Sequence, residues 1–428
     1  MQRIAVVLAA LAAAVPAMAD PVLDYSIGLG IEHSDNINYS ATDPVSQNVL
    51  IPRLDFRVDE KGATLTASAT GSLEYRDYLG GAFGDELRTL LDGSASWHIS
   101  PGRFDWIFQD SAGRQPVNAL VADAPNNQQQ TNVFSTGPSL RAKFSDTLRG
   151  QLDLRYTNSY ADTTRDFNSN RLGAVGSLLW PLDPADTLSA SVSTTRVRYI
   201  ENASEPFDYD REDVYAGWQR TLRSLTVEAA AGYSWLDPRS GDNQSGALLR
   251  GNLRWNPGPR THLGLSLDRE YSDAAQDLVF TPDQAGYVGI GSGINGQVVA
   301  PQVYVEKRVA FDVGHDEEAW SAGISPFWRR LDYVNDTASN QRSNGFYANA
   351  AWRFRPTLWL DAFAGEERRR YTALLRTDDD LAWGLSVNLQ RTRHWLWTLL
   401  YRHQRRNSSA PDSDYSENAL MLTVTFHR

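Results

Sequence analysis

Three features of the sequence predict an all-β fold, a transmembrane antiparallel up-and-down barrel of about 20 strands, with roughly 18 to 22 as the range. Apolar and polar residues alternate in long runs, short and long connections alternate between those runs, and the last run is apolar on one face. Runs of about ten residues exceed an ordinary strand and match one that crosses a bilayer at a tilt. The pattern therefore favours short periplasmic turns and longer extracellular loops.

The first residues predict export. Arg3 precedes the apolar run 4–15, and Ala17, Met18 and Ala19 form a small-residue cleavage site. Residues 1–19 are therefore expected to be a signal peptide, and residues 20–428 to form the barrel in the outer membrane of a Gram-negative bacterium. The chain has no cysteine, which excludes disulfides and thiolate metal sites. Its net charge of −11 argues against a nucleic-acid partner.

Strand-like alternation recurs along the chain. Apolar residues occupy every second position over 23–31, 65–75, 148–156 and 381–389. Such period-two patterns indicate strands with one apolar and one polar face. Prolines interrupt some of the runs, and each predicts a bulge or a strand end because it cannot donate a ladder hydrogen bond. These are Pro52, Pro138, Pro301 and Pro326.

The connections fall into two classes. Tight turns are expected near 60–62, 100–102, 145–147, 256–259, 355–357 and 392–394, and longer loops over 34–45, 114–129, 200–209, 237–243, 273–296, 334–341 and 407–414. Both chain ends fall on the short-turn side, so the number of strands is even. The glycine-rich loop 273–296 is the best candidate to fold inward as a constriction or plug.

Aromatic residues sort by connection type, which predicts two girdles at the membrane interfaces. The short-turn set is Trp97, Phe104, Phe144, Trp180, Trp255, Phe354, Trp359, Trp395 and Phe426. The long-loop set is Tyr75, Tyr78, Tyr156, Tyr160, Tyr199, Tyr271, Tyr333, Tyr371 and Tyr415.

The last strand carries an expected assembly signal. Leu420, Leu422, Val424 and Phe426 share one face, as in barrels whose last strand pairs with the first and is read by the barrel assembly machinery. Here His427 and Arg428 follow the aromatic residue, a departure from the usual terminal position.

The predicted inward face is polar and rich in cations. These are Arg53, Arg57, Arg141, Lys143, Arg149, Arg155, Arg250, Arg254, Arg308, Arg329 and Arg353. Arginine offers planar, multi-donor contacts to carboxylate and sugar oxygens, so the set could guide a polymer. Alternatively, the cations pair with acids across strands and hold a filled lumen rigid.

No catalytic residue, metal site or cofactor is predicted. The seven histidines are scattered without close metal-type spacing, and the loop carboxylates have the pattern of solvated residues. The basic stretches 368–370 and 402–406 lie near outer loops, where they could contact lipopolysaccharide phosphates or rim the pore.

One motif carries a family resemblance. The stretch Gly28-Leu29-Gly30-Ile31-Glu32-His33-Ser34-Asp35-Asn36-Ile37 resembles the start of outer-membrane barrel proteins from exopolysaccharide and exosortase (PEP-CTERM)-associated gene clusters. The resemblance covers the mature chain in architecture, through one short motif. It implies export or anchoring of a surface polysaccharide, with a periplasmic export protein as partner. Ser34, Asp35 and Asn36 then shape the first outer loop.

The sequence thus favours a non-enzymatic barrel that takes part in exopolysaccharide export. The expected partners are the polysaccharide, outer-membrane lipid and lipopolysaccharide. A small-solute porin, a surface hydrolase and a plugged structural barrel are the alternatives.

Overall fold

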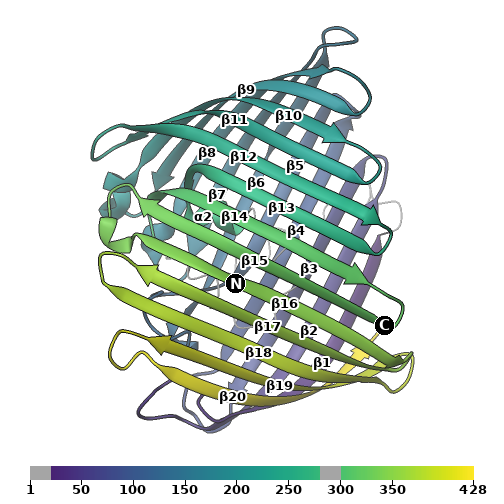
Figure 1. The fold of residues 1–428 in the computed structure, drawn as a ribbon, viewed down its shortest axis with the longest axis vertical. Helices are drawn as coiled ribbons and strands as arrows, with labels where there is room; N and C mark the ends of the chain where they lie inside the picture. The colour runs from purple at the N-terminus through teal and green to yellow at the C-terminus, as the bar shows by residue number, and fades with distance from the viewer. Residues whose placement is uncertain (1–20, 280–299) are drawn as a thin grey trace.

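The chain folds into one closed sheet of 20 antiparallel strands, in a computed structural model that describes residues 21–279 and 300–428. Each strand pairs with its chain neighbours, and β1 pairs with β20 to close the barrel (Figure 1). The predicted fold class and strand number are confirmed. The predicted signal peptide, residues 1–19, and residues 280–296 of the predicted inward loop lie outside the described residues.

The strands are long and similar in length. The first ten are β1 (Val22–Ser34), β2 (Gln47–Lys61), β3 (Leu65–Tyr78), β4 (Glu86–Ser100), β5 (Phe104–Pro116), β6 (Gln128–Lys143), β7 (Arg149–Ala161), β8 (Ser169–Pro181), β9 (Asp186–Tyr199) and β10 (Tyr209–Thr221). The second ten are β11 (Leu225–Pro238), β12 (Gln244–Gly258), β13 (Thr261–Asp273), β14 (Val303–Asp316), β15 (Trp320–Tyr333), β16 (Gln341–Arg355), β17 (Leu358–Tyr371), β18 (Arg376–Gln390), β19 (Trp395–Ser408) and β20 (Tyr415–His427).

Short and long connections alternate as expected. One end of the barrel carries the tight turns and the C-terminus (Figure 1). The other end, called the loop end below, carries the long loops and all the short helices of the described chain. These helices are η2 (Pro125–Asn127), η3 (Arg165–Phe167), η4 (Asn202–Phe207), α2 (Ala274–Val279) and η7 (Thr337–Ser339).

The prolines act as predicted. Pro52 in β2, Pro138 in β6 and Pro326 in β15 each lie where the pairing with the following or preceding strand is interrupted. Pro301 precedes the first residue of β14. A residue without an N–H group therefore marks either a gap in the ladder or a strand end.

The outer surface of the barrel is apolar. In β1, Ile27, Leu29 and Ile31 are about half exposed, whereas the residues between them are buried. Leu420 and Leu422 of β20 continue this surface across the closing seam, where Leu422 lies opposite Ile31. A closed sheet with an apolar outside satisfies its backbone groups internally, as a bilayer requires. Among residues 21–279 and 300–428, no helix is long and apolar enough to cross a bilayer.

The aromatic girdle is better formed at the short-turn end than at the loop end. Trp97, Phe144, Trp255 and Trp395 are exposed at the short-turn end. The prediction was wrong there for Trp359, which shares the lumen face of β17 with Asp361 and donates a hydrogen bond to it at 3.2 Å.

At the loop end Tyr75, Tyr156 and Tyr160 are exposed, but the prediction was wrong for Tyr78, Tyr199, Tyr271, Tyr333 and Tyr371, which are buried. It was also wrong for Tyr415, which lies on the inward face of β20 and stacks on Tyr39. Successive side chains point to opposite faces, so Tyr75 and Tyr78, three residues apart, lie on opposite sides of the sheet.

Two pairs of neighbouring strands separate at the loop end. The first pair is β4 and β5, whose pairing ends at Leu91 and Ala112 although both strands continue. The side-chain amide of Gln130 fills this gap. It accepts a hydrogen bond from the Thr89 N–H (3.2 Å) and donates to the carbonyl groups of Thr89 (2.8 Å) and Gly113 (2.9 Å). A side chain thus replaces the missing ladder bonds.

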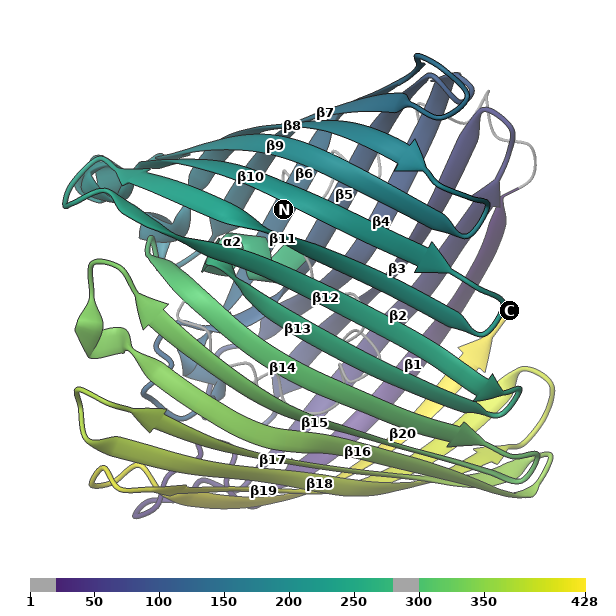
Figure 2. The ribbon, with the colours of Figure 1, turned by 45° about the horizontal axis from the view of Figure 1, so that its top comes forward.

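The second pair is β12 and β13. Their pairing ends at Leu249 and Arg269, although β12 begins at Gln244 and β13 runs to Asp273. Figure 2 shows the two strands diverging toward the loop end. The chain then leaves β13 and enters the barrel as α2.

The helix α2 lies inside the barrel (Figure 2). Ala274 and Ala275 pack in one apolar cluster with Val133 of β6. The Ser111 Oγ of β5 donates a hydrogen bond to the Leu278 carbonyl (3.2 Å). The prediction that the loop after β13 folds inward is therefore confirmed for residues 274–279.

Candidate functional site

The cations for which the sequence predicted a lumen position all lie on the inward faces of their strands. Most of them have a carboxylate within 4.0 Å: Arg53, Arg57, Arg141, Lys143, Arg155, Arg250 and Arg329. In the described part of the chain, no such carboxylate is found for Arg149, Arg254, Arg308 and Arg353. Pairing across strands, the alternative that the sequence left open, is found for Arg53, Arg141, Arg250 and Arg329, whereas the other paired cations contact acids of their own strand or the adjoining turn.

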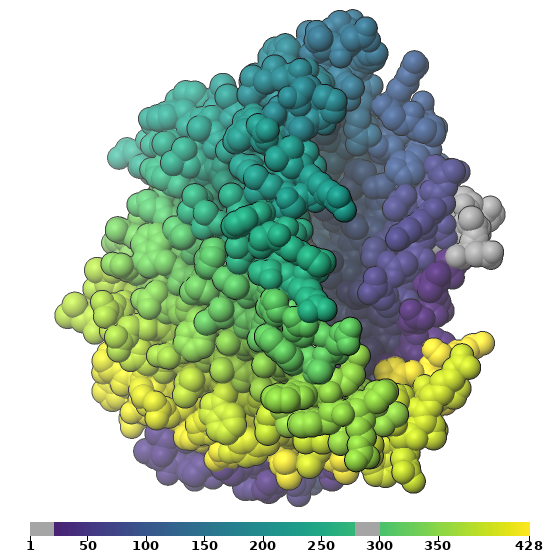
Figure 3. Space-filling view, turned by 45° about the vertical axis from the view of Figure 1, so that its right-hand side comes forward, coloured from purple at the N-terminus to yellow at the C-terminus, as the bar shows by residue number. Residues whose placement is uncertain are grey.

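The two halves of the lumen differ in solvent access. At the loop end, the inward residues Glu417 and Arg369 are only 0% and 2% exposed. At the short-turn end, the side chains of Arg57 and Lys143 are 61% and 62% exposed. Figure 3 shows the corresponding hollow, which opens between the turns of the teal and green strands and the purple strands. The lumen is therefore open at the short-turn end and filled at the loop end.

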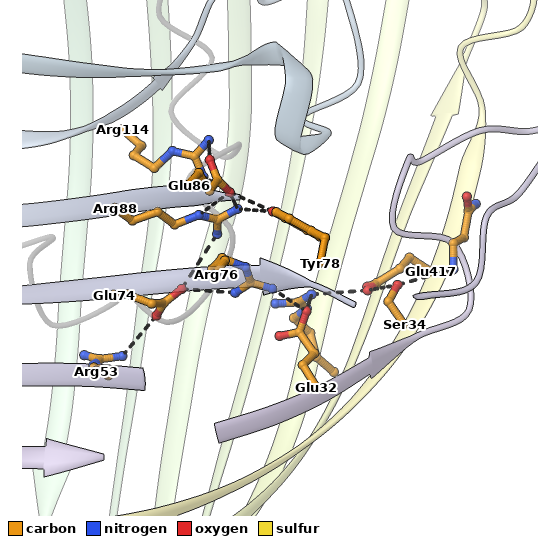
Figure 4. A network of polar contacts seen from close by, with 12 residues as sticks. Glu32, Ser34, Arg53, Glu74, Arg76, Tyr78, Glu86, Arg88, Arg114 and Glu417 are labelled. Carbon is orange, nitrogen blue, oxygen red and sulfur yellow. Dashed lines mark hydrogen bonds and ion pairs between the residues drawn. The ribbon is translucent and has the colours of Figure 1, made fainter. Parts of the chain in front are cut away.

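A chain of alternating charges crosses the inner wall near the seam (Figure 4). Arg53 of β2 lies 3.8 Å from Glu74 of β3, and Glu74 lies 3.1 Å from Arg76 of the same strand. Arg76 in turn reaches Glu32 of β1 at 2.7 Å. Arg76 and Glu32 are both buried, so each charge needs the other to offset its lost hydration.

The chain of charges continues across the closing seam of the barrel. Arg402 of β19 lies 3.9 Å from Glu32 and 3.2 Å from Glu417 of β20. Ser34 of β1 donates a hydrogen bond to Glu417 at 2.7 Å. The first and last strands are therefore joined by buried side chains as well as by backbone hydrogen bonds.

The predicted first-loop motif takes part in this closure. Asp35 accepts hydrogen bonds from the backbone and side-chain amides of Asn418, at 2.8 and 2.7 Å. The Asn36 side chain donates to the carbonyl groups of Ser40 (2.8 Å) and Ser416 (2.9 Å). The motif thus shapes the first loop and also fastens it to β20, a role that the sequence did not suggest.

A second group of charges lies on β3, β4 and β5. Glu86 accepts hydrogen bonds from Tyr78 (2.7 Å) and Arg88 (2.5 Å), and Arg114 lies 3.0 Å away. Arg88 is also 4.0 Å from Glu74, which connects this group to the chain described above (Figure 4). The inner wall formed by β19, β20 and β1 to β5 therefore carries one continuous polar network.

The helix α2 is anchored by carboxylates. Asp277 accepts hydrogen bonds from Tyr304 (2.7 Å) and Ser272 (2.6 Å) and forms an ion pair with Arg329. Arg329 also contacts Glu306 at 2.7 Å. These contacts hold the helix against β13, β14 and β15.

A second anchor lies just before the helix. Asp273, the last residue of β13, is 2.6 Å from Arg171 of β8 and accepts a hydrogen bond from Tyr209 of β10 (2.5 Å). Arg171 and Asp273 are both buried. The end of β13 is thus tied to strands several positions away around the barrel.

The loop between β5 and β6 also folds over the lumen. Its Val121 carbonyl accepts a hydrogen bond from Arg406 of β19 at 3.3 Å, and Arg406 pairs with Asp380 at 2.6 Å. Burial raises the pKa of Asp123 in this loop to about 7, against the opposing effect of Arg114 and Arg406. A carboxyl group with this pKa changes between its neutral and charged forms near neutral pH.

The alternation along β17 and β19 divides the basic stretches 368–370 and 402–406 between two environments. Arg369, Arg402 and Arg406 point inward, and their side chains are at most 15% exposed. Arg368 and Arg370 point outward and are exposed. The expectation of a pore rim or lipid contact applied to each stretch as a whole, and the structure separates their members by face.

Metal-binding side chains form no cluster in the described part of the chain. Among residues 21–279 and 300–428, no group of three or more His, Asp or Glu side chains is arranged to hold a metal ion. Sequence reasoning did not identify inner-wall residues such as Glu32, Arg76 and Glu417. Their period-two alternation indicates that they face the lumen, but it does not identify their partners, which lie far away in the sequence.

Comparisons with known proteins give only distant likenesses. No family model matches the sequence, and no curated protein matches it. The siderophore receptor PirA from Pseudomonas aeruginosa is 11% identical, with a TM-score of 0.44 over 94% of this chain and 80% of that chain.

Two further solved structures are similar at the same level. A mutant of the ferric enterobactin receptor PfeA from Pseudomonas aeruginosa is 10% identical over 95% of this chain and 80% of that chain, with a TM-score of 0.47. A BenF-like porin from Pseudomonas fluorescens Pf-5 is 8% identical over 96% of this chain and 100% of that chain, with a TM-score of 0.41. The barrel architecture of this chain rests on its own strand pairing.

Proposed function

We propose that the chain is an outer-membrane channel for hydrophilic cargo and that it takes part in the export of an exopolysaccharide. One observation carries the proposal: a closed barrel with an apolar outside encloses a polar lumen that is open at the short-turn end and filled by side chains and inward loops at the loop end. A barrel of this construction encloses a water-filled path once the filling segments move.

The wall of the open half suits sugars. Arg149, Arg254 and Arg353 face the lumen there without an ion-pair partner in the described chain, so their N–H groups are free to donate. Arg308 also lacks such a partner, but it lies opposite Arg329, in the filled half. Guanidinium groups bind carboxylate and hydroxyl oxygens in several geometries. Inward carboxylates such as Asp55 share the same wall, and this mixture of charges favours weak, repeated contacts over tight binding.

The polymer cargo is supported by the resemblance of the first strand and loop to exopolysaccharide-associated barrels. In this view a periplasmic export protein docks at the open end, and the barrel assembly machinery reads β20. No enzymatic activity is assigned.

A small-solute porin is the second candidate. The observation that favours it is the filled loop end: α2 and the β5–β6 loop lie across the path, and a polymer requires both to move. A small solute needs less room than a polymer.

Planar-bilayer recordings test both candidates. The mature protein is expected to conduct, and an acidic polysaccharide such as alginate, added on the short-turn side, is expected to block the current more strongly than neutral dextran of equal length. Current that neither polymer affects would support the porin instead. An absence of current, also after α2 is removed, would contradict both and support a plugged barrel. Glycan, lipid or peptide hydrolysis would point to an enzyme.

A further inference from the structure

Four cations form a lateral row on the outside of the barrel. Lys307 of β14 lies opposite Arg330 of β15, Arg330 lies opposite Arg342 of β16, and Arg342 lies opposite Arg370 of β17. These strands are neighbours in the sheet (Figure 1). Because neighbouring strands are about 4.8 Å apart, the row places four positive side chains next to one another on the outer surface.

The row faces away from the lumen. Leu331, Ser343 and Arg369, each one residue along its strand from a member of the row, are buried on the inner side. Alternation therefore directs Arg330, Arg342 and Arg370 outward, and all three are exposed.

The row also lies at the edge of the apolar outer surface that is nearer the loop end. Trp328 precedes Arg330 by two residues on the same face of β15, and Ile324 lies four residues before that. Ile324 is 45% exposed, and Trp383, on the outward face of β18, is 40% exposed. On a barrel whose long loops face the outside of the cell, this edge lies at the head groups of the outer leaflet.

The protein supplies too few counter-charges at this level. Asp332 alone serves both Lys307 (2.9 Å) and Arg330 (2.8 Å). Arg342 lies over the ring of Trp328, with its guanidinium carbon 5.5 Å from the ring centre. In the described chain neither Arg342 nor Arg370 has a carboxylate within 4.0 Å. Like charges directly opposite each other in a sheet are destabilising, so the pair calls for an anion from outside the chain.

We propose that this row, Lys307–Arg330–Arg342–Arg370, binds the phosphate groups of a phosphorylated glycolipid in the outer leaflet. A phosphate group carries more than one negative charge and several acceptor oxygens, and arginine binds it through two parallel N–H···O bonds. The apolar surface below the row would contact the acyl chains of the same molecule. The assignment rests on the outer-membrane location in the proposed function.

Another part of the same rim shows that basic residues near the loops do not all need such a ligand. Arg196 and Arg198 of β9 are both within hydrogen-bond distance of Asp210 in β10, at 3.3 and 2.7 Å. Arg198 also lies 3.8 Å from Asp208, so two carboxylates of the protein meet the charge of these two arginines. Arg196, whose side chain is 63% exposed, is therefore a matched control for the row.

Lipid binding by the mature protein in detergent micelles tests the assignment. Native mass spectrometry would follow titration with bis-phosphorylated lipid A, with the same lipid after removal of its phosphates, and with inorganic phosphate. The double variant Arg342→Gln/Arg370→Gln is expected to bind phosphorylated lipid A at least about tenfold more weakly. Arg196→Gln is expected to bind it as the parent does.

Three results would overturn the assignment: unchanged affinity in the double variant, equal binding of the dephosphorylated lipid, or an equal loss in Arg196→Gln. Binding of inorganic phosphate as tight as that of lipid A would show a free-anion site and would also overturn it. A heat-modifiable gel shift verifies that each variant is folded. Because the row lies outside the lumen, the double variant should conduct normally, so failure here is distinguishable from failure of the channel proposal.

Discussion

The two halves of the lumen use the same residue types in different ways. At the loop end Arg76, Arg369 and Arg402 are buried against carboxylates. At the short-turn end Arg57 and Lys143 also have acidic neighbours, but their side chains are more than half exposed. The two halves differ in how well loops and α2 shield them from water. Loops and α2 exclude water from the first half, so its ion pairs become structural, while the second half stays hydrated.

The largest expected effect concerns stability. Glu417 is 0% exposed and lies 3.2 Å from Arg402. When the Glu417 carboxylate is removed, the buried Arg402 keeps only Glu32, at 3.9 Å, as an ion-pair partner among the described residues. Breaking a buried pair in this way costs about 3–5 kcal/mol. We expect Glu417→Gln to lower the midpoint of urea unfolding in lipid vesicles clearly.

The hydrated half provides the control for this comparison. Asp146 pairs with Lys143 at 2.5 Å, but its side chain is 93% exposed. An exposed pair contributes little, so Asp146→Asn should leave the unfolding midpoint unchanged. Equal shifts in the two variants would contradict the contrast between the halves.

The next effect concerns the filling of the loop end. Asp273→Asn/Asp277→Asn removes the charged anchors of α2 to Arg171 and Arg329. We expect a severalfold larger single-channel conductance, because the helix no longer stays across the path. Asp242→Asn, in the exposed β11–β12 loop, should conduct as the parent does. A double variant with parental conductance would show that α2 does not limit the current.

A smaller effect is expected on ion selectivity. Arg254→Gln/Arg353→Gln neutralises two inward cations that lack ion-pair partners in the described chain. The ratio of chloride to potassium permeability, from reversal potentials in a salt gradient, should fall about twofold, since hydrated charges act weakly. Arg223→Gln changes an exposed cation in the β10–β11 turn and should leave the ratio unaltered. If both changes act alike, the lumen position of the pair is irrelevant.

The smallest effect depends on pH. Burial raises the pKa of Asp123 from 3.8 to about 7 in the folded chain, so the protonated form favours the packed loop. That contribution is fully present below the unfolded pKa and is lost as pH rises through about 7. The cations Arg88, Arg114 and Arg406 and the carboxylate Asp380 face the same group. We expect the open probability to increase between about pH 4 and 7, and the increase to vanish in Asp123→Asn.

The fold was predictable because its signal is local. Alternation within a run identifies a strand, Pro52 or Pro326 identifies a gap, and turn lengths identify the two ends of the barrel. The same locality explains the partial failure of the girdle: the prediction placed Tyr78 beside Tyr75 by its distance from the loop and overlooked the face to which each points.

The polar network was not predictable in the same way. Arg402 and Glu32 are at opposite ends of the sequence and meet only because β1 closes on β20. Likewise, Arg369 and Arg370 are adjacent in sequence, but one is buried in the lumen and the other is exposed outside. Which cation finds a partner depends on strand register, and register is fixed by the closed sheet.

The helix α2 has a mechanical consequence. Asp277 fixes it to Arg329 of β15, and its Leu278 carbonyl is bonded to Ser111 of β5. It therefore connects β15 to β5 through the inside of the barrel. This connection resists a change in the distance between β5 and β15. Lateral pressure from the bilayer would therefore deform the cross-section of the barrel mainly in the other direction.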